Sequence, residues 1–224
     1  FIQKRDGYPY FVYLGDIVTK LICLKKSNKL YNSEYNINFL NYSGLKDVKN
    51  FLRKKQINKD FFPKITIDLN DANKKYIIAK KNDNIVGIST LWNQTTFKQV
   101  IICDYKFQFN IFRMLFNFIS WLRKDSSFPN KGMPINYAYL SDIVIKDNNP
   151  KILKEILSFV KNKPIDNLSF VVVGLHDIDP LREATYDFRG INYKSKLFVV
   201  SWENCTNLIN RLKGQIYYPE ISIL

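Results

Sequence analysis

The clearest hydrophobic pattern lies between residues 137 and 160, where an apolar run changes into a helical repeat. Residues 143–145 (Ile-Val-Ile) predict a buried strand, because the run is too short for a helix. Residues 147–149 form a polar turn, and Pro150 suits the first helical position, where no backbone donor is needed. Apolar residues then recur every three or four positions at Ile152, Leu153, Ile156, Leu157 and Val160. We expect a strand and an amphipathic helix here. Such a junction can bind phosphate, although ordinary structural strand–helix units share the pattern.

Shorter patterns predict further strands and helices on both sides of this unit. Residues 8–26 predict two strands or a hairpin around Gly15–Asp16, and a polar linker follows. Asn82–Asp83–Asn84 separates two strands as a hairpin turn. The other predicted strands are 36–40, 97–103, 168–175, 195–202 and 215–224, and the other predicted helices are 44–56, 107–122 and 181–186. This order predicts an α/β (α+β) fold, with a mixed central sheet and helices on both faces.

The predicted helix 107–122 is unusually rich in aromatic residues. We expect it to be part of the core or a contact surface for a partner domain. The surrounding stretch 105–122 is a poor membrane span, because it contains Lys106, Gln108, Asn110, Arg113 and Asn117. No membrane contact is therefore expected.

Charge and cysteine content narrow the possible functions. The formal net charge of +14 favours a polyanionic partner, but the lysines are scattered along the chain and no nucleic-acid-binding motif is present. A basic nucleic-acid-binding module is therefore the third functional hypothesis, and nucleic acid is an unlikely partner. The three cysteines and single His176 lack the spacing of a zinc site, so no metal is predicted. Reduced, buried thiols indicate a cytoplasmic protein.

Several segments, in order, resemble the GNAT (GCN5-related N-acetyltransferase) superfamily. They are YIIAKKNDNIVGISTLWNQ, NYAYLSDIVIKD, VVVGLHDIDPL, FVVSW and IYYPEISIL, and Gly87 stands where that family commonly has a glycine. The set is similar to the C-terminal half of bacterial tandem GNAT-like proteins. The resemblance implies a GNAT-like acyltransferase domain over residues 34–224, with a mostly antiparallel sheet. Residues 1–33 would then be the closing strands of a preceding GNAT-like domain plus a linker.

This resemblance implies a cofactor and its position. GNAT enzymes bind acetyl-CoA where their fourth and fifth strands diverge, and the next helix N-terminus holds the pyrophosphate. The matching residues here are Ile143, Ile145, Asn148, Asn149 and Lys151. The family's R/Q-x-x-G-x-G/A pattern is replaced by IKDNNPKILKE, which has no glycine. Two hypotheses follow: an acetyl-CoA-dependent N-acyltransferase, or a catalytically degenerate domain with a structural or substrate-binding role beside an active partner domain.

The resemblance also implies catalytic roles. His176, or a water relayed from Asp142, would remove a proton from the acceptor, and Tyr186 would protonate the leaving thiolate. The alternatives are a hydrogen-bonded structural histidine for His176 and a core or surface role for Tyr186. The acceptor would be a small-molecule amine or a peptide amine, and the protein partner a preceding GNAT-like domain or a second copy of the chain. A polar and aromatic cluster could line the substrate cleft, or simply form a turn: Trp92, Asn93, Gln94 and Lys98.

Overall fold

The chain folds around one mixed sheet with helices on both faces. The structure is a computed structural model that describes residues 2–3, 8–25, 33–55, 60–163, 165, 167–202, 212 and 215–223. The strands are β1 (Ile2–Gln3), β2 (Tyr10–Cys23), β3 (Asn36–Phe39), β4 (Lys74–Lys81), β5 (Asn84–Asn93), β6 (Tyr137–Ile145), β7 (Phe170–His176) and β8 (Gly190–Ser201). The α-helices are α1 (Leu45–Lys55), α2 (Phe107–Arg123) and α3 (Pro150–Asn162), and the short 3-10 helices are η1 (Tyr42–Gly44), η3 (Lys146–Asn148) and η4 (Pro180–Thr185).

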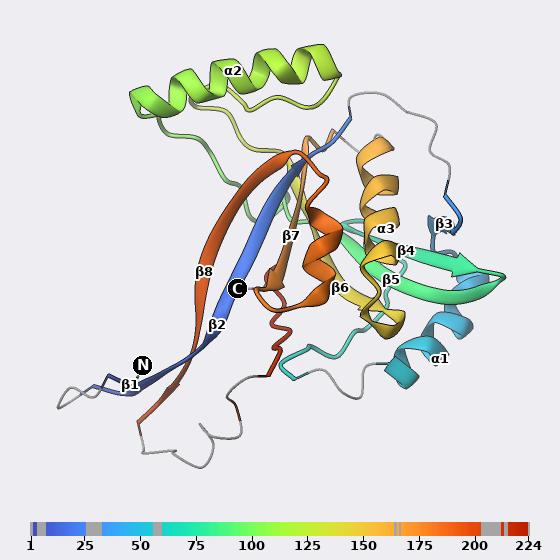
Figure 1. Cartoon of the computed structure of the whole chain (residues 1–224). Coiled ribbons are helices and arrows are strands. Elements are labelled where there is room, and N and C mark those ends of the chain that lie inside the picture. The colour runs from blue at the N-terminus through green and yellow to red at the C-terminus, as the bar shows by residue number, and fades with distance from the viewer. Residues whose placement is uncertain are drawn as a thin grey trace.

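The sheet is mostly antiparallel, as expected (Figure 1). Its order is β8-β2-β7-β6-β5-β4-β3, and β1 pairs with the first part of β2. Among the described strands, the one parallel pair is β6 with β7, and α3 makes the crossover between them. The predicted α/β class is confirmed.

Opposite faces of the sheet bury opposite sets of β4 side chains. Ile77 and Ala79 belong to the main core cluster together with the inner face of α3. Tyr76 and Ile78 belong to a second cluster with Val48 and Leu52 of α1. This alternation is the two-residue period of a strand, and it places α1 and α3 on opposite faces. The amphipathic patterns of both helices therefore predicted their packing.

β2 is one continuous strand, so the expected break at Gly15–Asp16 is wrong. The strand pairs with β8 on one side and with β7 on the other, and a bulge shifts its register between Tyr13 and Gly15. Gly15 has φ +133°, and a Cβ there would lie 2.3 Å from Nε2 of His176. The bulge therefore makes room for the histidine ring. Residues 10–23 thus lie inside the sheet that residues 34–201 build, while their origin in a preceding domain stays a prediction.

Two other predicted strands are wrong. Residues 97–103 form a loop that makes only a bridge at Ile101, because Phe97 and Lys98 donate their backbone N–H groups to the carbonyl of Gln94. Residues 215–223 are irregular; Pro219 has no N–H to donate, and a turn begins at Glu220. Most of the expected linker at residues 25–34 lies outside the described residues.

Helix α2 lies across one end of the sheet and contacts it through a narrow face (Figure 1). Phe116 and Ser120 are its buried residues, so the expectation of a core helix is wrong. Arg189 fastens this face by donating to the Phe116 carbonyl at 2.8 Å and to Oγ of Ser120 at 3.0 Å. Close by, the buried carboxylate of Asp125 lies 2.7 Å from Nζ of Lys25. The packed face thus combines one aromatic residue, Phe116, with the hydrogen bonds of Arg189, so the hydrophobic period of the helix did not locate it.

Gly15→Ala should destabilise the protein by about 3 kcal/mol, because the new methyl group would overlap the His176 ring at a positive φ. Gly132→Ala is the matched control: its φ is +80°, but no atom lies within 4 Å of the added Cβ, so strain alone should cost about 1 kcal/mol. Urea denaturation of both variants measures the difference. Equal losses would show that the Gly15 bulge is not built around the histidine.

Candidate functional site

The candidate site lies where the two parallel strands separate. β6 and β7 are in register at Tyr137–Phe170, Ala138–Val171 and Tyr139–Val172, and their pairing ends there. Beyond this point β6 contains a bulge, since Ser141 faces Thr90 of β5 and Val144 faces Ile88. Asp142, in the bulge, has φ +51°. The bulge bends β6 away from its straight path, so backbone and side chains that would face β7 are left to other partners.

Residues 215–223 lie against this divergence, and we call them the plug segment. Gly174 of β7 has no side chain, and a Cβ there would lie 2.6 Å from Cδ1 of Ile221. The backbone N–H of Asp142 donates to Oε2 of Glu220 at 2.8 Å. The buried side chain of Gln94 donates through Nε2 to the carbonyl of Ser222 at 2.8 Å. The plug segment therefore contacts β5, β6 and β7.

The plug segment leaves little free space at the divergence. The cavity between the strands and the plug segment measures about 30 Å³. A buried water needs roughly 10–15 Å³ of such volume, so the cavity holds one or two waters. Its walls come from β6, β7, the η4 region and the plug segment, among them Leu140, Ile143, Gly174, Tyr217 and Glu220. In this conformation the divergence has no room for a coenzyme.

The start of α3 is also occupied by groups of the chain. The N-cap residue Asn149 accepts the backbone N–H of Lys151 through Oδ1 at 3.0 Å, and its carbonyl accepts from Ile152 at 3.2 Å. Pro150 supplies no donor. Asn148 lies 3.4 Å from the Tyr218 hydroxyl of the plug segment. Side chains of Ile143 and Ile145 face the core cluster shared with α3. The five residues expected to hold the cofactor lie close together, but their first-turn donors are already used.

Two half-buried carboxyl groups lie close together here, Asp142 of β6 and Glu220 of the plug segment. Burial raises the pKa of Asp142 above its usual 3.8, and the positive charge of Lys74 partly opposes this change. Burial also raises the pKa of Glu220 above its usual 4.5, although N–H groups of Asp142 and Ser222 donate to it. The negative charge of Asp142 raises the pKa of Glu220 further, by less than desolvation does. Holding both as anions therefore costs folding free energy.

His176 is buried at the end of β7, with both ring nitrogens directed at the chain. Nε2 donates to the carbonyl of Leu14 at 3.1 Å, since a carbonyl can only accept. Nδ1 lies 3.1 Å from Oδ1 of Asp177 and 3.5 Å from the backbone N–H of Ile178. A general base needs a ring nitrogen that can reach the substrate proton. This arrangement instead matches the structural alternative for the residue.

The other candidate residues do not meet at one point. Tyr186 is 61% exposed, and the guanidinium of Arg182 lies 5.9 Å from its ring centroid. It does not line the cavity at the divergence. Asn93 accepts from the backbone and hydroxyl of Thr95, which is the turn chemistry expected as its alternative role.

The remaining members of the predicted substrate cluster do gather near the end of β5. Nζ of Lys74 lies 4.5 Å from the Trp92 ring centroid, and Nζ of Lys98 lies 5.8 Å from that of Tyr139. Gln94, however, is buried beneath the plug segment. Gln94 therefore does not line an open cleft in this conformation.

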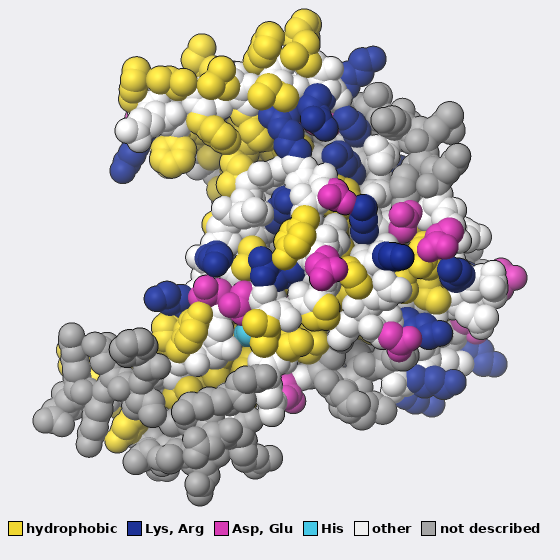
Figure 2. Space-filling view, in the orientation of Figure 1, with side chains coloured by type: hydrophobic (Ala, Val, Ile, Leu, Met, Phe, Trp, Pro, Cys, Tyr) yellow, Lys and Arg dark blue, Asp and Glu magenta, His cyan; other side chains and the backbone are white. Residues whose placement is uncertain are grey.

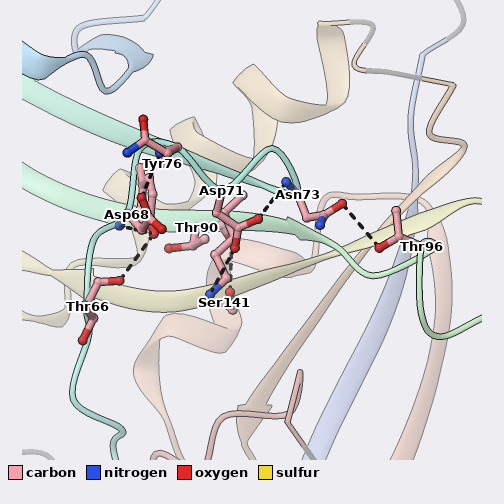
Figure 3. A network of polar contacts seen from close by, with 10 residues as sticks. Thr66, Asp68, Asp71, Asn73, Tyr76, Thr90, Thr96 and Ser141 are labelled. Carbon is pink, nitrogen blue, oxygen red and sulfur yellow. Dashed lines mark hydrogen bonds and ion pairs between the residues drawn. The ribbon is translucent and has the colours of Figure 1, made fainter.

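A larger hollow that the sequence analysis missed lies along β3 and β4. It measures about 510 Å³, within the usual size range of ligand pockets, and is lined by Phe39, Leu40, Asn41, Tyr42, Leu69, Asp71, Ala72, Lys74, Lys75 and Tyr76. Figure 3 shows the polar network beside it: Tyr76 accepts from the N–H of Asp68 at 3.0 Å, and Asp71 accepts from that of Asn73 at 2.9 Å. The signal was available in the polar run Asp68–Asn73 before β4, where Asx turns shape the backbone.

The described residues contain neither a metal-binding cluster nor a membrane-spanning helix. In the part of the chain that the structure describes, no group of three or more His, Cys, Asp or Glu side chains could hold a metal ion. Likewise, none of the described helices has the length and apolar character needed to cross a bilayer. Cys23 is buried and burial raises its pKa to about 11, but Cys103 is exposed, so the expectation of buried thiols fails there. Cys205 lies outside the described residues.

Comparisons with known proteins give no function. No protein-family model matches the chain, and no curated protein matches it. Among solved structures, a functionally unknown conserved protein from Staphylococcus epidermidis ATCC 12228 is similar, with a TM-score of 0.46 and 12% sequence identity. The match covers 85% of this chain and 63% of that protein. The chain thus spans less than two thirds of that protein's length.

Gly174→Ala should loosen the plug segment, because the added methyl group would overlap the Ile221 side chain. We expect a loss of about 2 kcal/mol, and Ile221→Ala in the same chain should recover at least ~1 kcal/mol of it as coupling between the two sites. Denaturation of both single variants and the double variant measures this coupling. Strict additivity would contradict direct packing of Ile221 on Gly174.

The two half-buried carboxyls should make stability depend on pH. Because burial raises their folded-state pKa values above 3.8 and 4.5, their favourable contribution is complete below those values and is lost as the pH rises. The wild type should therefore lose free energy of unfolding, relative to Asp142→Asn/Glu220→Gln, as the pH rises above about 4. Denaturation of both proteins as a function of pH measures the difference. A constant difference would contradict the proposed desolvation.

Proposed function

We propose that this chain is a catalytically degenerate GNAT-like domain, which serves a structural or substrate-binding role beside an active partner domain. The observation that carries the proposal is the plug segment, which leaves a cavity of about 30 Å³ where β6 and β7 diverge. Acetyl-CoA in a GNAT enzyme would lie at the corresponding place. A coenzyme with an adenosine diphosphate group and a long pantetheine arm does not fit a space for one or two waters.

The chemistry at the start of α3 supports the same proposal. A pyrophosphate needs free backbone N–H groups and a positive local field. Here Asn149 takes up the N–H groups of Lys151 and Ile152, Pro150 has none, and Asp147 adds negative charge in the preceding turn. His176, with both ring nitrogens directed at the chain, supplies no evident base. Binding and catalysis are therefore both weakened at the positions that the family resemblance indicates.

The larger hollow along β3 and β4, which we call the groove along β3 and β4, is a candidate place for substrate binding. That groove measures about 510 Å³ and combines carboxylate, ammonium and phenol groups with apolar walls. Asp71 lies 3.7 Å from Nζ of Lys74, so both charge signs are present within one site. Such a lining suits a ligand with both an amino and a carboxyl group, such as an amino acid or a peptide end.

The alternative proposal is an acetyl-CoA-dependent N-acyltransferase whose plug segment moves aside. The observation that favours this alternative is the arrangement of β6 and β7. These parallel strands are connected by α3, and they separate after three paired residues. In that state Asp142 would lie beside the vacated position, since its N–H now donates to Glu220. Movement of the plug segment is then a precondition for any acyl transfer.

Isothermal titration with acetyl-CoA tests these proposals. The wild-type chain should release no heat of binding at millimolar coenzyme, because the divergence is filled. Glu220→Ala/Ile221→Ala, which removes two plug contacts, should behave in the same way if the domain is degenerate. Ile223→Ala is the matched control, since that side chain belongs to the plug segment but is 62% exposed.

Two outcomes would contradict the leading proposal. Binding of acetyl-CoA by the wild type with a micromolar Kd would sink it outright. Binding that is at least ~10-fold tighter in Glu220→Ala/Ile221→Ala than in Ile223→Ala would instead favour an acyltransferase that the plug segment blocks.

A further inference from the structure

The most apolar side of α2 faces away from the rest of the protein. At 100° per residue, eight apolar side chains fall within an arc of roughly 160° on this helix. They are Phe107, Ile111, Met114, Leu115, Phe118, Ile119, Trp121 and Leu122, each between 44% and 80% exposed. The opposite side carries the contacts with the protein, made by Phe116, Asn117 and Ser120. We call the eight exposed residues the outer arc of α2.

Helices of single domains usually bury their apolar side. Here eight apolar side chains stay exposed instead, and Figure 2 shows hydrophobic side chains along the outer edge of α2. An exposed patch of this kind marks a surface that binds something. Its position on a helix, rather than on a loop, gives the patch a fixed and continuous shape.

The surroundings of the outer arc are cationic. Residues 105–124 contain no Asp or Glu, but they contain Lys106, Arg113, Arg123 and Lys124. Two further cations touch the helix, since Nζ of Lys25 donates to the Arg123 carbonyl at 2.8 Å and Arg189 lies over the Phe116 ring. Figure 2 likewise shows Lys and Arg side chains gathered beneath one end of α2.

The nearby acidic groups do not cancel this charge. Asp125 is fully buried and lies within ion-pair distance of Lys25, Arg123 and Arg189. Asp104 pairs with Lys131 at 3.1 Å. The helix therefore presents an apolar ridge whose inner border is positive. In-plane membrane helices carry this combination, with aromatic and aliphatic side chains in the acyl region and cations level with the headgroups.

A second copy of the chain fits this surface less well. A helix of this length is roughly 25 Å long and 10 Å wide, so two packed copies would bury at most about 1,000 Å², below the ~1,200 Å² of stable interfaces. Two copies would also bring the same cations together. Binding to an anionic bilayer does not require a contact of that size, and the lipid headgroups supply the opposite charge.

We propose that α2 binds the surface of an anionic lipid bilayer, lying in the plane of the membrane with its outer arc inserted between the headgroups. This arrangement differs from crossing the bilayer, and it departs from the expectation of no membrane contact. Binding through α2 would hold the sheet and the groove along β3 and β4 close to the membrane surface.

Flotation with vesicles tests the proposal. The wild-type chain should float with phosphatidylcholine vesicles that contain phosphatidylserine, at least ~10-fold more than with phosphatidylcholine alone, and high salt should reduce the difference. Leu115→Glu/Phe118→Glu should abolish flotation. The matched control is Ile178→Glu/Val200→Glu, which makes the same charge change at side chains that are 54% and 51% exposed but lie outside α2.

A second readout reports insertion directly. In a Trp92→Phe/Trp202→Phe background, Trp121 is the remaining tryptophan, and anionic vesicles should shift its emission to the blue. All tested side chains in the outer arc are exposed, so circular dichroism should show unchanged folding.

Three outcomes would overturn the proposal. Equal flotation with both kinds of vesicle, or none with either, would remove the anionic bilayer as the partner. Flotation that Leu115→Glu/Phe118→Glu leaves unchanged would place any lipid contact elsewhere. A dimer in sedimentation velocity that these two changes dissociate, without wild-type flotation, would make the outer arc an interface between copies.

Discussion

The early end of the β6–β7 pairing is the constraint on which the rest of the site depends. Parallel strands that continued in register would satisfy each other's backbone groups and close the sheet. The bulge at Asp142 stops this after three pairs, and it leaves an N–H group and the surface over Gly174 without strand partners. Glu220 and Ile221 of the plug segment meet these two needs, one polar and one apolar.

A segment of the same chain is a strong competitor for any ligand at this place. Tethering gives it an effective local concentration in the millimolar range, which a free molecule must exceed or outbind. The plug segment is not ideally matched to its position, however. It places a second half-buried carboxyl beside Asp142, and both carry raised pKa values because water is excluded. The plug segment therefore fits the shape of the divergence well, but burying its carboxyl group is unfavourable. Because protonation removes the buried charge, pH changes the stability of this contact.

Sequence patterns predicted the parts of the fold that repeat locally. The hairpin between β4 and β5 followed from Asn82 and Asp83, which adopt the positive φ that such turns need, and the α3 helix followed from Pro150 and its apolar face. Local patterns of this kind do not show which distant strands pair with each other. Nothing local distinguishes one bulged strand at residues 10–23 from two strands, because the bulge exists to fit His176, a residue far along the chain.

The site was harder to predict for the same reason. Asp142 and Asn148 both contact the plug segment, whose residues look like an ordinary strand in the sequence, whereas Asn149 caps α3 through Lys151. The spacing of apolar residues in α2 predicted that this segment is a helix. It could not show which side faces the sheet, because Arg189 and Asn117 anchor it through polar contacts.

The pairing of β2 sets the order of events during synthesis. This strand is made long before its partners β7 and β8, which follow only after the rest of the sheet, with Ile22 paired to Gly190. At usual translation rates, roughly 180 residues separate the end of β2 from the end of β8, a delay of roughly 10–35 s. Residues 17–23 of β2 lack their partners on both sides until β7 and then β8 are made. The chain therefore depends on slow, non-local contacts to complete its sheet, and chaperones that shield exposed strands would be expected to act on β2.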